Sequence, residues 1–385
     1  MAVAVGGRGC TNLDRSGLSL NVRKIEVADV IMVELFQIRV QWGERLAIFE
    51  PPSGVGNDHT RLTPVGPNGD VGMSTLHVLF ENEDWMPPLR AALDAKGVPY
   101  TEHVVLDGHV DLSAVPPEGV FLNRMSPSSH TRGHQGGVTF LQQYLHVLEA
   151  HGRRVINGSR AFELEVSKVR QDLALSVAGI RTPRTLAVVG GPDRLKAAAR
   201  TMDLPFITKD NQGGKGLGVH LFRDLDVFNA YVDSDEFVVG PDNVTLLQQY
   251  IAPRGSFITR VEIVDSVFQY AIKSSTEGGF ELCPADACSI GDDFCPMGED
   301  ARFSLREEVT ADDPLVASYI EMMRANSIDV AGIEFVEDAN GLRYTYDING
   351  TTNFNSDVER ARGLSGMTAI VELAERCLSE HLVPA

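Results

Sequence analysis

The chain has 385 residues, enough for two or three domains of roughly 100 to 200 residues each. Hydrophobic residues make up 43% and charged residues 23%, a balance that is typical of globular proteins and excludes a chain disordered throughout. The formal net charge of -19, from 34 Lys and Arg against 53 Asp and Glu, argues against a nucleic acid or an anionic membrane as the partner.

Residues 1–72 differ from the rest of the chain. Glycine- and proline-rich breaks surround one apolar stretch, 27–40, which reads as a strand pair or as a helix. At Met73 the pattern changes to a short apolar strand. We expect Met73 to be the functional start and 1–72 to be an appended extension, disordered or included by a wrongly assigned start. A separate small domain is the competing interpretation.

Three regions follow this extension. Strand and helix patterns alternate over 73–160, as expected for a parallel α/β domain with helices on both faces of the sheet. Region 161–251 begins with a helical pattern that stops at Gly179 and then alternates strands and helices around a glycine-rich loop. Region 252–385 reads as longer antiparallel strands. The predicted strands cover 76–81, 100–106, 120–126, 182–189, 205–210, 219–222, 244–251, 258–275, 330–338 and 342–350. The predicted helices cover 87–97, 136–152, 166–180, 192–202, 224–232, 313–327 and 367–382.

Targeting signals and cysteine usage indicate the compartment. No run of about 18 uncharged apolar residues occurs, and the first ten residues lack the pattern of a secretory signal. We therefore expect a cytoplasmic protein. The spacing of three cysteines in one loop could bind zinc, but no fourth ligand is evident, so packing or substrate-loop roles are favoured. The odd set of five fits free thiols better than a disulfide scaffold: Cys10, Cys283, Cys288, Cys295 and Cys377.

The glycine-rich loop 209–218 is the most suggestive local feature. Glycines let a backbone approach a ligand closely, and exposed amides can hold phosphate oxygens. The loop lacks the GK[ST] ending of a Walker motif and lies between two strand patterns. A mobile hairpin with a solvated lysine is the alternative, and it stays open. The loop carries Gly213, Gly214, Lys215, Gly216 and Gly218.

A set of oxygen donors lies far downstream. Glu334 belongs to one predicted strand, and Asp347 and Asn349 share one face of the next because they are two residues apart. Such donors suit Mg²⁺, which completes its octahedron with phosphate oxygens and water. A metal site is favoured over a merely polar sheet face because charged side chains are costly to bury unpaired. The cations that complete the inventory of a nucleotide-phosphate site are Lys168, Lys209, Arg260 and Lys273.

The order of these motifs resembles the ATP-grasp fold, and in particular its RimK-like branch of glutamate and peptide ligases. The resemblance runs from about Leu76 to Leu378, through SK (167–168), GIRTPRT, PFITKDNQGGKGLGVHLF, LLQQYI, TRVEIV, AIK, GIEFV and DIN. It implies a mixed α/β and α+β protein, with a parallel pre-ATP-grasp domain at 73–160. The small lobe with the glycine lid would be 161–251 and the lobe with the metal site 252–385, and the two α+β lobes would enclose ATP.

The resemblance also implies roles for single residues. Lys168 and Lys209 would contact the nucleotide, and the glycine loop would cover its phosphates. Arg260 and Lys273 would lie near the transferred phosphate. Glu334, Asp347 and Asn349 would bind Mg²⁺ or Mn²⁺. The hinge whose backbone meets adenine would be Gln248, Gln249, Tyr250 and Ile251.

The implied activity is an ATP-dependent ligase that forms an amide from a small carboxylate and an amine, such as an amino acid or a peptide, through an acyl phosphate. An ATP-grasp phosphotransferase and a nucleotide-binding regulatory protein with a degenerate site are the rivals, and homo-oligomerisation is left open. Two departures limit the resemblance: Ile258 replaces an acidic residue that would contact ribose, and 274–295 replaces an Arg- and Asn-containing stretch.

The segment 124–134 follows a predicted strand, where α/β sheets tend to bind ligands. It could hold the acid substrate, and a solvated loop is an equally good interpretation. Its polar side chains include Arg124, Ser126, His130, Arg132 and His134, of which Arg124, Ser126 and Arg132 are the substrate candidates.

Overall fold

The computed structural model describes residues 75–214, 216, 218–276 and 303–381. The chain separates into two units, 1–56 and 57–385, and the described residues all belong to the second. The predicted start at Met73, the apolar stretch 27–40, Lys215 and the cysteines other than Cys377 therefore lie outside the described residues. Cys377 is a buried free thiol, as predicted.

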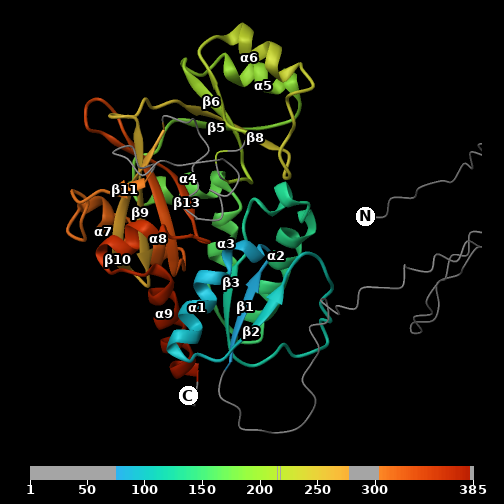
Figure 1. Ribbon diagram of the computed structural model, residues 1–385. Coiled ribbons are helices and arrows are strands. Elements are labelled where there is room, and N and C mark those ends of the chain that lie inside the picture. Colours follow the sequence, from blue (N-terminus) through green and yellow to red (C-terminus); the bar gives the residue numbers. More distant parts are fainter. Residues whose placement is uncertain (1–74, 215, 217, 277–302, 382–385) are drawn as a thin grey trace, which may run out of the picture. The chain divides into compact units, whose positions relative to one another are not determined.

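The first sheet is parallel, with strand order β2-β1-β3-β4 (Figure 1). Every residue of β1 and β3 is buried, which reflects helices packed on both faces of the sheet. Leu76 and Val78 point to the core that α1 and α9 cover, whereas Leu79 and Phe121 point to the core beneath α2. The elements are β1 (Leu76–Phe80), η1 (Glu83–Trp85), α1 (Pro87–Lys96), β2 (Tyr100–Val104), β3 (Val120–Arg124), η2 (Ser129–Arg132), α2 (Gln135–Ala150) and β4 (Arg154–Ile156).

Two short helices lead from this sheet to the second one. Ser167 caps α4, because its side chain accepts a hydrogen bond from the Arg170 amide. The second sheet is antiparallel, with order β5-β8-β6-β7, and α5 and α6 cover one face around Phe206 and Phe228. The elements are α3 (Ser159–Glu165), α4 (Lys168–Val177), β5 (Thr185–Val189), α5 (Pro192–Ala199), β6 (Phe206–Asp210), β7 (His220–Phe222), α6 (Leu225–Val232) and β8 (Val244–Gln249).

The third sheet is antiparallel, with order β11-β10-β9-β12-β13. Helix α7 packs on one face through Tyr319, which is buried with Val261 and Phe335. Helix α9 packs on the other face and also belongs to the core of the first sheet. The elements are β9 (Phe257–Val264), β10 (Val267–Ser275), β11 (Phe303–Leu305), α7 (Pro314–Ala325), β12 (Val330–Glu337), β13 (Arg343–Asn349), α8 (Ser356–Arg362) and α9 (Gly366–His381).

The predicted fold class is confirmed: a parallel α/β sheet is followed by two antiparallel α+β layers. The strands and helices that the sequence missed are the short ones, η1, η2, β4, α3, β11 and α8, with three to seven residues each. Such lengths carry too few residues for a period of 2 or 3.6 to stand out. The domain boundaries near 160 and 251 stay predictions. Within the described residues, no helix is long and apolar enough to span a membrane.

Candidate functional site

A cavity of about 400 Å³ lies between the second and third sheets, at the glycine loop. Its walls come from β6, the end of β8, the start of α4 and the strands β12 and β13. The predicted residues that line it are Lys168, Lys209, Gly213, Gly214, Gly216, Gln248, Gln249, Tyr250, Ile251, Glu334, Asp347 and Asn349. The structure therefore brings together groups from both ends of the predicted site.

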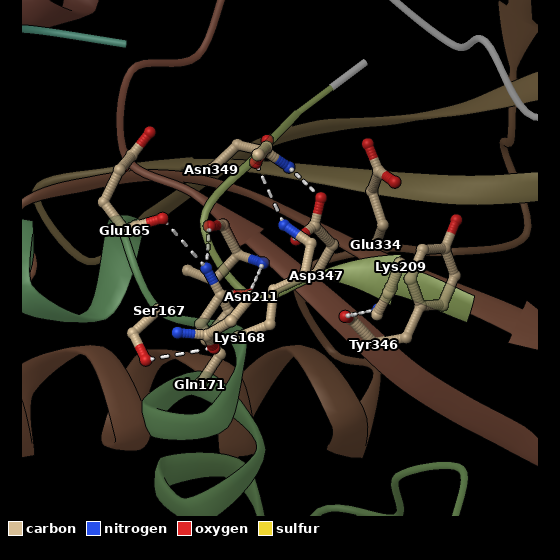
Figure 2. A network of polar contacts seen from close by, with 12 residues as sticks. Glu165, Ser167, Lys168, Gln171, Lys209, Asn211, Glu334, Tyr346, Asp347 and Asn349 are labelled. Atoms are coloured by element: carbon tan, nitrogen blue, oxygen red, sulfur yellow. Dashed lines mark hydrogen bonds and ion pairs between the residues drawn. The ribbon is translucent and has the colours of Figure 1, made fainter. Parts of the chain in front are cut away.

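Two lysines reach this cavity from different elements. Burial lowers the pKa of Lys209 to about 8, and the nearby charge of Lys168 acts in the same direction. The Lys209 ammonium lies 3.4 Å from the Tyr346 carbonyl oxygen and 5.6 Å from the centre of the Tyr346 ring. Lys168 Nζ lies 3.2 Å from the Gly213 carbonyl oxygen and 3.2 Å from Asp347 Oδ1 (Figure 2). Two ammonium groups close to one another favour a bound anion.

Asn211 fastens the start of the glycine loop to the start of α4. Its carbonyl oxygen accepts a hydrogen bond from the Lys168 amide at 3.1 Å, and its Oδ1 accepts one from the Val169 amide at 2.8 Å. The Ser167 hydroxyl donates to the same Oδ1 at 3.2 Å. These hydrogen bonds hold the backbone at Lys168 close to the strand end that carries Lys209, although 41 positions separate the two lysines in the sequence. Sequence reasoning missed Asn211, because a polar residue at the start of a loop is unremarkable.

The oxygen donors form one group at the far wall of the cavity (Figure 2). Glu334 of β12 and Asp347 of β13 are direct partners across the two strands. Asn349 follows on the same face, with Nδ2 3.4 Å from Asp347 Oδ2. Within the described part of the chain, no group of three His, Cys, Asp or Glu side chains could hold a metal. A cation here would therefore use two carboxylates and one amide oxygen, a hard donor set that fits Mg²⁺ with phosphate and water completing its shell.

The pKa values of the two carboxyl groups are shifted in opposite directions. Burial raises the pKa of Glu334, and the neighbouring Asp347 charge adds to this increase. Burial also acts to raise the pKa of Asp347, but the charges of Lys168 and Lys209 outweigh it and lower that pKa overall. The pair is therefore a site where added positive charge is favourable.

Arg260 lies directly behind this group and does not line the cavity. It is only 5% exposed, and its guanidinium donates to Glu334 Oε1 at 2.9 Å, to Glu262 Oε1 at 2.7 Å and to the Thr352 hydroxyl at 2.7 Å. A Cβ atom at Gly332 would overlap this guanidinium, so only glycine leaves room for it. In this arrangement Arg260 holds Glu334 in place.

Lys273 is not brought to the cavity. It pairs with Thr259 in the β9–β10 ladder, whereas Arg260 pairs with Ile272, so the two cations point to opposite faces of the sheet. Lys273 Nζ lies 5.2 Å from the centre of the Phe257 ring and 3.1 Å from Glu308 Oε1. Gly218 also lies outside this cavity and lines a different one.

The three substrate candidates of the segment 124–134 are all bonded within the protein. Arg124 donates to the Thr352 carbonyl oxygen and to Asn353 Oδ1, each at 2.8 Å. Arg132 forms an ion pair with the buried Glu81. Ser126 shares a hydrogen bond of 2.8 Å with the Ser128 hydroxyl. A Cβ atom at Gly214 would lie 3.6 Å from Ser128 Cβ, so this segment touches the glycine loop.

Glu165 is a further charged residue that sequence reasoning missed. Both of its carboxylate oxygens accept hydrogen bonds of 3.1 Å from the Thr351 amide, in the turn that follows β13. Burial raises the pKa of Glu165 to about 7, against the lowering effect of the Thr351 and Gly350 amides. A Cβ atom at Gly350 would overlap the carboxylate. Glu165 therefore links α3 to the strand that carries Asp347 and Asn349.

Comparisons with known proteins bear on the fold of the chain. No protein-family model matches the chain. It is 24% identical over 255 residues to a probable alpha-L-glutamate ligase of Haemophilus influenzae, across 65% of this chain and 74% of that protein. Among solved structures, it matches the RimK-domain ATP-grasp protein of Sphaerobacter thermophilus with a TM-score of 0.52 and 18% identity, across 77% of this chain and 99% of that one.

A second solved structure is the ATP-grasp ligase PsnB in complex with minimal precursor, Mg and ADP. It matches with a TM-score of 0.53 and 14% identity, across 81% of this chain and 100% of that one. The chain thus has the ATP-grasp fold, and the resemblance to RimK-like proteins that its motifs indicate is confirmed.

Proposed function

We propose that the protein is an ATP-dependent ligase that joins a small carboxylate to an amine and releases ADP and phosphate. The observation that carries this proposal is the convergence of Lys168, Lys209, Glu334 and Asp347 on one cavity bounded by the glycine loop. The names of the similar proteins, a probable glutamate ligase and an ATP-grasp ligase, support the same reaction class. Substrates of the amino-acid or peptide class are proposed on the same basis.

ATP would lie along the cavity with its base at the end of β8. Tyr250 and Ile251 line that end, and Ile207 and Val336 supply apolar walls for a flat base. The triphosphate would then meet Lys168 and Lys209, whose ammonium groups offset its negative charge. Ile258 lines the cavity where an acidic residue would bind ribose, so we propose that this contact is absent.

Glu334, Asp347 and Asn349 would hold Mg²⁺, with Mn²⁺ as a substitute. When bound, the ion supplies positive charge between the carboxylates and the phosphates. Arg260 keeps one Glu334 oxygen occupied at 2.9 Å, and Lys168 approaches one Asp347 oxygen at 3.2 Å. These contacts orient the carboxylates, and binding of the ion would replace the 3.4 Å contact between Asn349 Nδ2 and Asp347 Oδ2.

The proposed reaction has two steps. In the first, a carboxylate oxygen attacks the γ-phosphorus of ATP, the bond to the β-phosphate oxygen breaks, and ADP leaves. In the second, an amine nitrogen attacks the carbonyl carbon of the acyl phosphate, and phosphate leaves with the former carboxylate oxygen. The side chains around the cavity position the reactants and offset charge, and none is required as a nucleophile. The glycine loop would exclude water while the acyl phosphate exists.

An isotope experiment tests the reaction class. The full chain is incubated with ATP, Mg²⁺ and panels of ¹⁸O-carboxylate acids and amines, and mass spectrometry follows phosphate and amide. We expect ADP release that depends on both substrates, an amide product, and one ¹⁸O atom in the released phosphate. A stable phosphorylated product formed without an amine would establish the phosphotransferase instead. ATP binding without ADP release across the panel would favour the regulatory alternative.

A further inference from the structure

A second cavity, of about 520 Å³, lies on the other face of β6. It is bounded by the small lobe, including the segment 236–241, and by residues near the start of α2. Ile207 of β6 lines the nucleotide cavity, and Thr208 lines the second one, because successive side chains alternate across a strand. Lys209 and Asp210 border both cavities, but the Lys209 ammonium contacts Tyr346 on the nucleotide side.

The Thr208 hydroxyl lies at this second cavity. Thr208 is 3% exposed, and its Oγ1 makes no hydrogen bond within the part of the chain that the structure describes. A buried hydroxyl is nearly always hydrogen-bonded, because leaving it unsatisfied destabilises the fold. A ligand with a hydrogen-bond donor would satisfy this oxygen.

The neighbouring carboxylate of Asp210 lines the same cavity. Asp210 is half-buried, and among residues 75–214, 216, 218–276 and 303–381 its side chain has no hydrogen bond or ion pair. Gly240 lies so close that a Cβ atom there would be 2.8 Å from Asp210 Cγ. Burial raises the pKa of Asp210 to about 6, and the charge of Asp242 contributes to this increase. The charges of Lys168 and His220 act against this increase without cancelling it, so further positive charge at this carboxylate is favourable.

Aromatic side chains form the adjoining wall. The rings of His220 and Tyr231 lie 4.7 Å apart, and those of Tyr231 and Phe237 lie 5.8 Å apart. All three line the second cavity, as does the exposed carboxylate of Glu236. Carboxylates beside aromatic rings recognise ammonium groups through ion pairs and cation–π contacts.

We propose that the second cavity binds a primary ammonium group, carried by a free amine or by the lysine side chain of a polypeptide. Asp210 forms the ion pair, the Thr208 hydroxyl accepts one ammonium hydrogen, and Tyr231 packs against the aliphatic stem. Asp210 ends β6 where the glycine loop begins, and Gly218 near the end of that loop also lines this cavity. Occupation of the cavity therefore couples to nucleotide binding, and reciprocally. Binding here does not depend on the ligase activity proposed above.

Calorimetric titration of the full chain without nucleotide tests this site. The probes are cadaverine for a free amine, acetyl-glycyl-lysyl-glycine amide for a polypeptide lysine, and 1,5-pentanediol as an uncharged control of similar length. We expect one or both ammonium probes to bind and the diol not to bind. Asp210→Asn should weaken binding by at least about tenfold. Asp203→Asn removes a fully solvated carboxylate of the same lobe and should leave binding unchanged.

Thr208→Val separates recognition from folding. The substitution removes the unsatisfied hydroxyl at nearly constant volume, so thermal stability should be unchanged or higher, while ammonium binding weakens by about three- to tenfold. In a second titration, the bound probe should change the affinity for ATP in the wild type but not in Asp210→Asn. Absence of binding by both ammonium probes up to about 10 mM, or equal affinity in wild type and Asp210→Asn, would overturn the proposal.

Discussion

The two faces of the third sheet carry cations that differ in burial and in ion pairing. On the face toward the cavity at the glycine loop, Arg260 is buried and shared by two carboxylates, Glu262 and Glu334. On the opposite face, Lys273 is partly exposed and pairs with Glu308 at the surface. Both cations stand in similar apolar strand patterns in the sequence. A difference of one position in the antiparallel register decides which of them supports the site.

The largest effect is expected from removing the charge of Asp347, which lines the cavity. Asp347→Asn keeps the shape but removes the charge that would face the cation. We expect metal-dependent ADP release to fall by on the order of a thousandfold, because charge stabilisation at transferred phosphates is a large part of catalysis. Coupled-enzyme assays of ADP check this result. The same variant should keep the wild-type unfolding midpoint within a few degrees, and full activity would remove Asp347 from the metal site.

Arg260→Met tests how much the buried ion pairs of Arg260 stabilise the fold. The substitution leaves Glu262 and Glu334 buried without their shared cation, and breaking such a cluster costs about 3–5 kcal/mol. Urea denaturation followed by circular dichroism should show this loss of unfolding free energy. A loss below about 1 kcal/mol would mean that the two carboxylates relax or take up protons at little cost.

Glu165 extends the comparison to a buried carboxylate that backbone amides satisfy in place of a cation. Its pKa of about 7 in the fold exceeds the ordinary value of 4.5, so the native state holds a proton that the unfolded chain has lost in this window. The free energy of unfolding should therefore fall as pH rises from 4.5 to 7, by on the order of 1–3 kcal/mol from this group. Glu165→Gln should flatten that slope in urea titrations at several pH values. Parallel slopes for wild type and variant would show that Glu165 is already ionised in the fold.

Lys273→Met should have the smallest effect and completes the contrast with Arg260→Met. A partly exposed ion pair contributes about 0–1 kcal/mol, so the unfolding free energy should change by no more than that. ADP release should stay within about twofold of the wild type, because Lys273 lies on the face away from the cavity. A large loss of turnover with unchanged stability would instead show that Lys273 takes part in the reaction.

Sequence patterns predicted those parts of the site that depend on local spacing. The two-residue separation of Asp347 and Asn349 places both on one strand face, and the glycine loop lines the same cavity as these two side chains. The motif order that resembles ATP-grasp proteins supplied Lys168 and Lys209 as partners. Lys273 was expected near Arg260. The face on which each side chain lies depends on how β9 pairs with β10, and the pattern of a single strand does not encode that pairing.

The contacts that sequence reasoning missed are long-range. Glu165 meets the Thr351 amide across 186 positions, and Arg124 meets Thr352 across 228. No local periodicity marks such partners, because their meeting depends on how separate sheets pack. Their side chains look like ordinary charged residues on a helix end and a strand end until the fold places them.

Helix α9 joins two layers of the molecule. It belongs to one continuous apolar core with Leu76 of the first sheet, Leu89 of α1, and Val264 and Tyr270 of the third sheet. The small lobe instead keeps a core of its own around Phe206 and Phe228. Helix α9 therefore joins the first and third sheets through one shared core. The second sheet, which has a separate core, is the layer that we expect to move when the cavity opens. Truncation of the chain before α9 should destabilise the first sheet, whose core includes α9, more than the second sheet, whose core does not.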